Sequence, residues 1–542
     1  MTRRVGLSIG LLAPIACTHA CADVVISAHA TAHMSCSAGV CTPTAAKAFL
    51  NVDDLQSMLA SSSVTVKSTP AAPDIHVVIA LSWTSSSTLF FDSYHALAIE
   101  APISVTGTGA LTIRTDDGGV GGDYAFSGKG HAIFWDTNSS LTINAHSYML
   151  VADIASLASG YAATPAADLA LADDYDAAPD GTYAQSPIAT TVLGNFEGLG
   201  NTISNLHIRY RGKTRQNIGL FASVNGGTIR DLNLRHAKVV AQPRPDGAAQ
   251  VGMLAGEFSG GTLRNDTAVG TVSVSPSPTA ASGDAGGLVG VLSGGLVVDS
   301  SFDGTVSAGR AVAGGLVGQA VGAQITRSSS TATVNGSVEQ GGLVGVATNS
   351  TFLLDHATGN LTGPAAFSGG LIGWTMGGKV MQSYATGSVI GGAGSYAGGL
   401  IGQNEKECTV VESYALGAVT AQKNSHVGGL VGNNRYVHPP SISQAYSTGA
   451  VSASGGGLHL LVGGLLGFDR TMNVEFTYWD LDTSGIADPS RGAGSPANDP
   501  GITGMSDTAL KSGLPGGFDP TVWGSDPAIN GGLPYLLAVP PS

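Results

Sequence analysis

One cluster of side chains has the residue types of a metal site. His29, His33, Cys36 and Cys41 lie close together in the sequence and could be considered four ligands. Their spacing does not match a recognised zinc pair, and two thiols in an oxidising compartment more often form a disulfide. We therefore predict a disulfide between Cys36 and Cys41, and we predict no metal and no other cofactor. Cys17 and Cys21 lie in the N-terminal segment that we expect to be removed, so Cys408 is left over. We expect it to be a partly buried thiol in place of a small residue, with a reactive site as the alternative.

Two acidic loops could bind calcium or remain solvated turns. The first combines Asp116 and Asp117 with Asp123 around a run of glycines, and the second lies at 173–176. The second loop lacks a glutamate at the spacing of an EF-hand. A solvated turn is the preferred interpretation, and a weak calcium site is the alternative.

Recognised catalytic motifs are missing from the sequence. It has no His-Glu-x-x-His motif, no Gly-x-Ser-x-Gly motif between a strand and a helix, and no glycine-rich loop followed by Lys-Ser or Lys-Thr. The acidic residues of the second half, such as Asp299, Asp303 and Asp355, are scattered. We therefore predict no catalytic residue, and the sequence favours a non-enzymatic protein over an enzyme.

The composition limits the protein class and its partners. The chain has 542 residues, of which 78 are glycine, and 11% are charged. A hydrophobic content of 43% is too high for a disordered chain, and no Gly-X-Y period indicates collagen. The net charge of −14, without a basic run, makes nucleic acid an improbable partner.

The first 22 residues have the order of a secretory signal. Arg3 and Arg4 precede an apolar stretch at 5–16, and small residues follow up to Ala22. We expect cleavage after Ala22 and an exported chain that is extracellular or on the cell surface, with the periplasm as an alternative. No later stretch reaches the roughly 20 apolar residues of a membrane helix, so we expect no transmembrane segment after cleavage.

A repeated sequence motif organises the second half of the chain and determines where its side chains lie. The phrase Gly-Gly-Leu-Val-Gly recurs through the second half of the chain with a period of about 28 residues, and two looser copies precede it. The first apolar residue of each copy should point into the core. These repeat-core residues are Leu220, Met253, Leu288, Leu316, Leu343, Leu371, Leu400, Leu430 and Leu465.

Each repeat carries three short segments of β-branched alternation, separated by glycine turns. Such segments are strands, and three of them cannot bury their apolar faces alone. Successive repeats must therefore stack, with each strand pairing to its counterparts in the neighbouring repeats. The fold class that we predict is all-β, a right-handed parallel β-helix (solenoid) with an N-terminal cap and a C-terminal closing segment.

A second phrase, Ser-Tyr-Ala-Thr-Gly, follows the first and places an aromatic residue at a constant phase. Tyr384, Tyr414 and Tyr446 share this phase and should form an aromatic ladder. A core or surface ladder is the preferred interpretation, and a sugar-binding platform is the alternative.

The repeats define the expected domains. After the signal at 1–22, we expect a cap and irregular coils at 23–188, repeats at 189–470 and a closing cap at 471–542. A short helix at 51–59, capped by Asn51 or Asp53, could plug the open end of the solenoid. The Ala-rich segment at 153–180 has the composition of a helical insertion.

These phrases resemble the GLUG motif of bacterial surface and filamentous-haemagglutinin-like proteins. The stretch at 196–206 resembles the coil that usually opens such arrays, and Thr477-Tyr478-Trp479-Asp480 resembles their closing segment. The resemblance covers about residues 190 to 540. It implies a β-helix and an adhesin-like role, and it is almost silent on activity.

Two functions remain as alternatives. The preferred one is an exported, non-enzymatic surface or secreted protein that binds an extracellular glycan or a host or matrix protein. The other is a polysaccharide-active lyase or hydrolase, which would require three or more carboxylates and an Arg or Lys clustered in one groove.

Overall fold

The computed structural model describes residues 22–212, 214–243, 248–275, 283–435, 441–470 and 472–541. Strands dominate these residues and pair mostly in parallel, so the prediction of an all-β chain is confirmed. None of the helices found in these ranges has the length and apolar character to cross a membrane. The predicted secretory signal lies outside the described residues except for Ala22.

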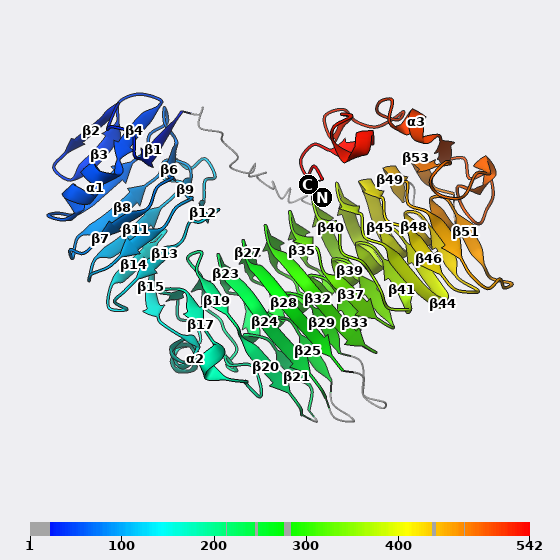
Figure 1. The fold of residues 1–542 in the computed structure, drawn as a ribbon, viewed down its shortest axis with the longest axis horizontal. Helices are drawn as coiled ribbons and strands as arrows, with labels where there is room; N and C mark the ends of the chain where they lie inside the picture. Colours follow the sequence, from blue (N-terminus) through cyan, green and yellow to red (C-terminus); the bar gives the residue numbers. More distant parts are fainter. Residues whose placement is uncertain are drawn as a thin grey trace, which may run out of the picture.

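The N-terminal region, drawn in blue in Figure 1, consists of short strands. They are β1 (Asp23–Ser27), β2 (Met34–Ser37), β3 (Val40–Pro43), β4 (Ala48–Asn51), β5 (Val64–Lys67), β6 (Asp74–Val77), β7 (Leu81–Trp83), β8 (Thr88–Asp92), β9 (Leu97–Ile99), β10 (Ile103–Val105), β11 (Ala110–Arg114), β12 (Tyr124–Phe126), β13 (Ala132–Phe134) and β14 (Ser140–Ile143). One sheet has the order β12-β9-β6-β1-β4, and a second has the order β13-β10-β7. A third group pairs β3, β5, β8, β11 and β14 in parallel, so three faces enclose one apolar core.

A disulfide closes the β2–β3 hairpin. Cys36 and Cys41 are register partners in this antiparallel pair, and they are bonded. Cys41 is buried in the N-terminal core. Because both sulfur atoms are consumed by the bond, the alternative of four metal ligands with His29 and His33 does not apply to this structure.

Helix α1 (Val52–Leu59) covers the edge of a sheet. Asn51 caps it, since its side chain accepts hydrogen bonds from two N–H groups of the first turn. Leu55 and Leu59 enter the N-terminal core. Gln56 Oε1 accepts a hydrogen bond from the Ser82 N–H of β7 at 3.0 Å. Because β7 is the outermost strand of its sheet, α1 protects an edge that would otherwise be open.

The Ala-rich segment is helical only in its first part. Helix α2 (Ile154–Ala163) follows β15 (His146–Val151) and starts at Asp153 in a capping box. The chain then returns to strand in β16 (Leu169–Leu171) and β17 (Tyr175–Asp176), which pair in parallel with β18 (Phe196–Glu197) and β19 (Thr202–Ser204). The expectation of a single helical insertion is therefore wrong beyond Ala163, because buried Leu169 and Leu171 join the core.

The repeat region places four short strands in most repeats, in four columns. The first column contains β21 (Gln216–Ile218), β25 (Ala249–Val251), β29 (Asp284–Gly286), β33 (Val312–Gly314), β38 (Glu339–Gly341), β41 (Ala365–Gly369), β44 (Val389–Gly398), β47 (His426–Gly428) and β51 (Leu461–Gly463). The second contains β22 (Phe221–Asn225), β26 (Ala255–Ser259), β30 (Val289–Ser293), β34 (Val317–Val321), β39 (Val344–Leu353), β42 (Ile372–Met381), β45 (Ile401–Ala415), β48 (Val431–Asn434) and β52 (Leu466–Asp469).

The third and fourth columns complete each repeat. The third contains β18, β23 (Thr228–Arg230), β27 (Thr262–Arg264), β31 (Leu296–Val298), β35 (Gln324–Thr326), the later parts of β39, β42 and β45, and the first parts of β49 (Ile442–Ser447) and β53 (Val474–Asp480). The fourth contains β19, β20 (His207–Tyr210), β24 (Asn233–Ala241), β28 (Thr267–Val274), β32 (Ser301–Gly309), β36 (Ser329–Ser330), β37 (Thr333–Gly336), β40 (His356–Ala357), β43 (Tyr384–Ala385), the first part of β44, β46 (Val419–Ala421), β50 (Val451–Ala453), the ends of β45, β49 and β53, and β54 (Ile502–Met505). Strands of successive repeats pair in parallel, as the side-by-side arrows of Figure 1 show.

A recurring bend separates the third column from the fourth. It contains one non-glycine residue with positive φ, for example Asp299, Arg327 or Gln382. A buried serine or aspartate follows, and its side chain accepts a hydrogen bond from the preceding repeat. Ser383 N–H, for instance, donates to Ser413 Oγ at 3.3 Å. The sequence pattern indicated three segments because no glycine marks this bend.

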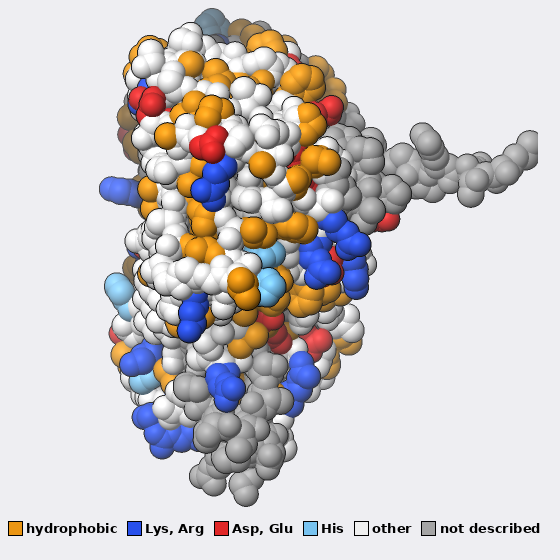
Figure 2. Space-filling model, turned by 90° about the vertical axis from the view of Figure 1, so that its right-hand side faces the viewer, with side chains coloured by type: hydrophobic (Ala, Val, Ile, Leu, Met, Phe, Trp, Pro, Cys, Tyr) orange, Lys and Arg blue, Asp and Glu red, His pale blue; other side chains and the backbone are white. Residues whose placement is uncertain are grey.

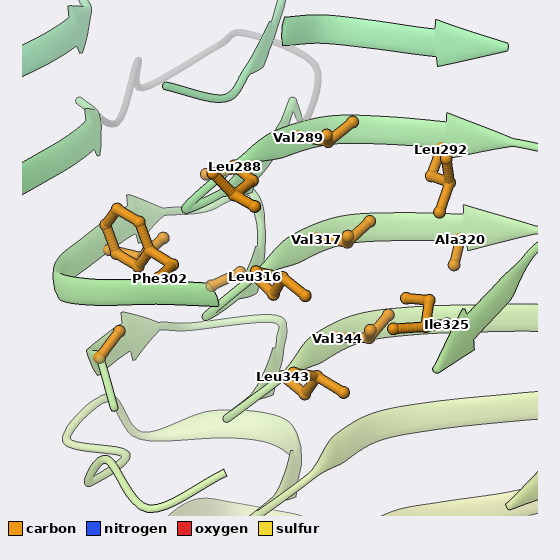
Figure 3. Close-up of a cluster of buried hydrophobic side chains, with 14 of the residues drawn as sticks. Leu288, Val289, Leu292, Phe302, Leu316, Val317, Ala320, Ile325, Leu343 and Val344 are labelled. Carbon is orange, nitrogen blue, oxygen red and sulfur yellow. The ribbon is translucent and has the colours of Figure 1, made fainter. Parts of the chain in front are cut away.

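The repeat-core residues form an apolar column inside the array. All nine are at most 1% exposed and belong to one continuous core. Figure 3 shows Leu288, Leu316 and Leu343 one above another, with Val317 and Val344 forming a parallel row. Since each residue packs on its counterpart in the next repeat, neighbouring repeats stabilise one another.

The C-terminal segment folds back over the tyrosine ladder. Tyr384, Tyr414 and Tyr446 stack at centroid separations of 4.9 and 5.1 Å. They are at most 2% exposed, because Phe518 and Trp523 pack on them. The segment also includes α3 (Asp507–Leu510), β55 (Trp523–Gly524) and β56 (Tyr535–Leu536). Parallel pairing continues through β53 and β54, so the stacked strands extend past residue 470 into the expected closing cap.

Candidate functional site: an aromatic strip in the glycine corner

The Gly-Gly-Leu-Val-Gly phrase makes a tight corner between the first and second columns. Its apolar marker points into the core, whereas its first and last glycines line the outer side of the corner. A Cβ atom on Gly369 would lie 2.6 Å from Gly402 N, and one on Gly402 would lie 2.5 Å from Gly373 O. Real Cβ atoms do not come closer than 3.0 Å, so only glycine lets the two strands meet at this angle.

Two rows of outward side chains flank this corner. One row precedes the first glycine of each phrase by two residues and includes Asn217, Gln250, Asp284, Glu339, Phe367, Tyr396, His426 and Leu461. The other row follows the last glycine and includes Ser223, Glu257, Val291, Gln319, Val346, Trp374, Gln403, Asn433 and Phe468. Strand register aligns each row along several repeats.

Aromatic rings occupy the later repeats of the corner. Phe367 and Trp374 stack across it with centroids 5.3 Å apart. Tyr396 lies 5.5 Å from Phe367 and 4.9 Å from His426, whose ring is 5.6 Å from Phe468. All five side chains are half-buried. We call these five residues the aromatic strip.

Buried polar atoms with unmet hydrogen bonds lie in the strip and beside it. Trp374 Nε1, His426 Nδ1 and Asn433 Oδ1 have no hydrogen-bond partner among the described residues. Gln403 and Asn433 are buried and are joined by a hydrogen bond of 3.3 Å from Asn433 Nδ2 to Gln403 Oε1. Because these polar atoms are buried, the surface that the strip offers to a ligand consists of its half-buried rings.

The earlier repeats of the same corner are polar and hollow. A pocket of about 400 Å³ lies between Arg215, Asn217, Gln250 and Glu257. Asn217 Nδ2 donates to Glu257 Oε2 at 2.7 Å, which fixes one wall of this pocket. The corner therefore changes from a carboxylate-containing pocket to an aromatic surface along its length.

Burial changes the charge state of the corner. It raises the pKa of Asp284 to about 6, although Arg215 opposes this shift, and it also raises the pKa of Glu339. Burial lowers the pKa of His426, so this imidazole is neutral at pH 7. No member of the aromatic strip then carries a charge. Figure 2, which views the side at the right of Figure 1, shows Lys, Arg, Asp and Glu side chains scattered among hydrophobic and uncharged polar ones.

The tyrosine ladder is unsuited to ligand binding in this structure. Tyr446 Oη donates to Pro534 O at 2.6 Å, and Tyr478 Oη donates to Gly516 O at 2.6 Å. Both acceptors belong to the covering segment. The alternative of a sugar platform on Tyr384, Tyr414 and Tyr446 therefore has no exposed ring surface.

A second candidate site joins the N-terminal region to the repeats. Arg230 Nε donates to Asp231 Oδ2 at 2.7 Å, and its guanidinium lies 3.7 Å from the ring centroid of Tyr124. Tyr124 Oη donates to Glu197 Oε2 at 2.5 Å. Asp123, which was expected in a solvated turn or a calcium site, instead pairs with Arg230 at 3.2 Å and with Arg264 at 2.9 Å.

We call these residues the junction cluster. They have the types found in a glycan-cleaving site, but a glycan cannot reach their carboxylates. Glu197, Asp231 and Asp266 are at most 1% exposed. Desolvation raises the pKa of Glu197 to about 8 and that of Asp266 as well. Since the carboxylates do not reach solvent, the geometry explains how two regions are joined rather than how a polysaccharide is bound.

The remaining acidic positions have local partners. Asp116 Oδ1 accepts a hydrogen bond from Gly121 N–H at 2.7 Å, and Asp117 pairs with Arg114 at 3.1 Å. In the loop at 173–176, Asp174 accepts from Thr202 N–H and Asp176 from Asn205 Nδ2. These contacts describe closed turns that hold neighbouring strands.

The sequence predictions did not include the aromatic strip. The residue types at these positions differ from repeat to repeat, so no repeated sequence motif marks the strip. The available signal was their constant offset from the glycine phrase, because Phe367, Tyr396 and His426 each precede it by two residues. A residue two positions before the first glycine points outward beside the corner, so this offset identifies the strip positions once the glycine phrase is known to form a corner.

Comparison with known proteins yields only partial likenesses. No family model matches the chain. A stretch of 142 residues is 37% identical to halomucin of Haloquadratum walsbyi, and it covers 24% of this chain and 1% of halomucin. An IgA1 protease structure shares 16% identity at a TM-score of 0.34, covering 55% of this chain and 22% of that one. A candidate immunoglobulin A1 protease from Bacteroides ovatus shares 18% identity at a TM-score of 0.29, covering 72% and 93%. Both TM-scores are too low to carry over a function.

Proposed function

We propose that the chain is an exported, non-enzymatic protein that binds an extended, uncharged glycan along the aromatic strip. In this proposal the repeats wind as a right-handed parallel β-helix, and the chain is of the GLUG-repeat type that its phrases resemble. The protein would act at the cell surface or outside the cell. The glycan would be part of a host or matrix surface.

The observation that carries the proposal is the composition of the strip. Half-buried aromatic rings offer apolar surface to the C–H groups of a sugar. Successive repeats of a parallel sheet place these rings about 4.8 Å apart, which suits a linear polymer. The absence of charge on the strip favours a neutral glycan over an acidic one.

The proposal is tested with a glycan array followed by titration of the full chain with the best neutral oligosaccharide. Trp374→Ala and Tyr396→Ala should each weaken binding about tenfold or more, since each removes a ring face. Trp135→Ala is the matched control, because Trp135 is 71% exposed and lies in the N-terminal region. The affinity of this variant for the oligosaccharide should be unchanged.

Product analysis separates the two functions. The oligosaccharide should be recovered intact after prolonged incubation. Shortened or unsaturated products would instead support the polysaccharide-active enzyme. Equal affinity of wild type and both strip variants would contradict binding at the strip.

A further inference from the structure

A group of metal-ligating side chains lies on the outer face of the first N-terminal sheet. Asp23 in β1 and Asp74 in β6 are register partners, and His76 is two residues further along β6. One ligand atom from each of Asp23, Asp74 and His76 lies within 4.8 Å of the other two. Two of these three side chains are buried, with Asp23 at 5% and His76 at 7% exposure.

The imidazole of His76 is oriented toward the carboxylates. Nδ1 is fixed by Glu100 Oε1 of the loop after β9, at 3.0 Å. Nε2 is buried and has no hydrogen-bond partner among the described residues, and it lies 3.6 Å from Asp23 Oδ2. A histidine whose far nitrogen is held by a carboxylate is the arrangement that orients and strengthens metal-ligating imidazoles.

Asp74 is held in place in a similar way. Its Oδ1 accepts hydrogen bonds from His95 Nδ1 at 2.6 Å and from Ala96 N–H at 2.9 Å. Both donors belong to the segment that leads into β9. These contacts fix the carboxylate and leave Oδ2 as the oxygen for a metal bond.

We propose that Asp23, Asp74 and His76 form a binding site for one divalent transition-metal ion of the zinc class. Two carboxylates and one imidazole suit Zn²⁺ better than Ca²⁺, which prefers oxygen ligands alone. Zinc ligands at bond lengths of about 2.1 Å lie roughly 3.4 Å apart, so a small contraction of the group would close the site around the ion.

The site would connect β1 to β6 at the start of the sheet. Because the three ligands come from two neighbouring strands, binding would stabilise the folded N-terminal region and not the unfolded chain. This role is independent of glycan binding, since the aromatic strip belongs to other strands.

The experiment uses the full chain after removal of metal with EDTA. Calorimetric titration with ZnCl₂ should show one ion per chain, and CoCl₂ should give visible absorption bands typical of a bound ion of low coordination number. Saturating Zn²⁺ should raise the melting temperature. CaCl₂ at the same concentration should produce neither binding heat nor a thermal shift.

Variants assign the site to these residues. Asp23→Asn, Asp74→Asn and His76→Gln should each abolish the one-ion isotherm, while Glu100→Gln should weaken it about tenfold. His146→Gln is the control, because His146 forms a comparable pair with Asp168 at 3.2 Å outside the site and should bind Zn²⁺ normally. Circular dichroism verifies that each variant is folded.

Two results would overturn the proposal. One is the lack of stoichiometric Zn²⁺ binding and of Co²⁺ absorption by the wild-type chain, which needs no variant. The other is unchanged binding by a folded Asp74→Asn chain, which would place the ion elsewhere.

Discussion

At the scale of the residue, the glycine phrase creates two environments that differ in how well the sequence predicts them. Leu371 is at the apex and faces the core, and its counterparts in other repeats are all apolar. Burial constrains such a position to one residue type, so the pattern identified it directly. Trp374 and Phe367 face outward, where packing does not select one residue type, and no pattern of types revealed them.

Replacing Leu400 by aspartate should damage the array severely. Leu400 is 0% exposed, and an unpaired buried carboxylate costs several kcal/mol, on the order of 4 kcal/mol or more. The matched control is Ile390→Asp, because Ile390 is 38% exposed and lies in β44, just before the same glycine phrase. Circular dichroism and thermal melting should show a large loss for Leu400→Asp and a small one for Ile390→Asp. Equal melting curves for the two variants would contradict the inward orientation of the marker.

Cys408 should be chemically inert in the folded protein. The expectation of a partly buried thiol was wrong, because Cys408 is only 1% exposed. Its register partner in the preceding repeat is Gly378, in accord with a small residue at this position. Burial raises the pKa of the Cys408 thiol to about 12, which leaves almost no thiolate at pH 8.

A thiol-specific disulfide reagent tests this property. It should label Cys408 slowly or not at all in native buffer at pH 8. In denaturant it should label one thiol per chain that begins at Asp23, because Cys17 and Cys21 lie in the expected signal. Rapid native labelling would show that the repeat opens at this position.

At the scale of the element, the sequence predicted strands and a capping helix but not every bend. Asn51 was one of two predicted caps, and it caps α1. The bends after the third column were missed because residues such as Arg327 and Gln382 adopt positive φ without glycine. Only the stacking of neighbouring repeats enforces that backbone, and a local pattern does not contain this information.

The junction cluster should make stability depend on pH. The folded pKa of Glu197 is about 8, above the value near 4.5 of an exposed glutamate. Between these two values the unfolded chain has released a proton that the folded chain retains. The free energy of unfolding should therefore fall as the pH rises from about 4.5 to 8 and then level off. Ionisation of Glu197 should account for about a few kcal/mol of this loss.

A variant that cannot ionise at position 197 isolates the contribution of Glu197 to the pH dependence. Glu197→Gln keeps an acceptor for the Tyr124 hydroxyl and cannot ionise, so its free energy of unfolding should fall less between pH 5 and 8. Glu475→Gln is the control, because Glu475 is exposed on β53. Urea unfolding at several pH values gives the comparison. A steeper fall for Glu197→Gln than for wild type would contradict the raised pKa.

At the scale of the whole molecule, the predicted all-β architecture follows from a repeat too short to fold alone. Each repeat buries its apolar residues only against its neighbours, which joins the core from the α2 region to β54 into one cluster. The C-terminal segment that covers the tyrosine ladder was expected as a cap, but its contacts with Tyr446 involve residues about 85 positions away and were not readable from the sequence. A separation of 107 residues likewise hid the pairing of Asp123 with Arg230.

The central claim is that the aromatic strip is the glycan-binding surface, and hydroxyl-radical footprinting tests it most directly. The full chain is oxidised with and without the best neutral oligosaccharide, and the modification of each residue is measured by mass spectrometry. Trp374, Phe367 and Tyr396 should be protected by the glycan, while exposed Trp135 should be oxidised equally in both samples. Protection that avoids the strip, or that appears at Trp135 instead, would contradict the account.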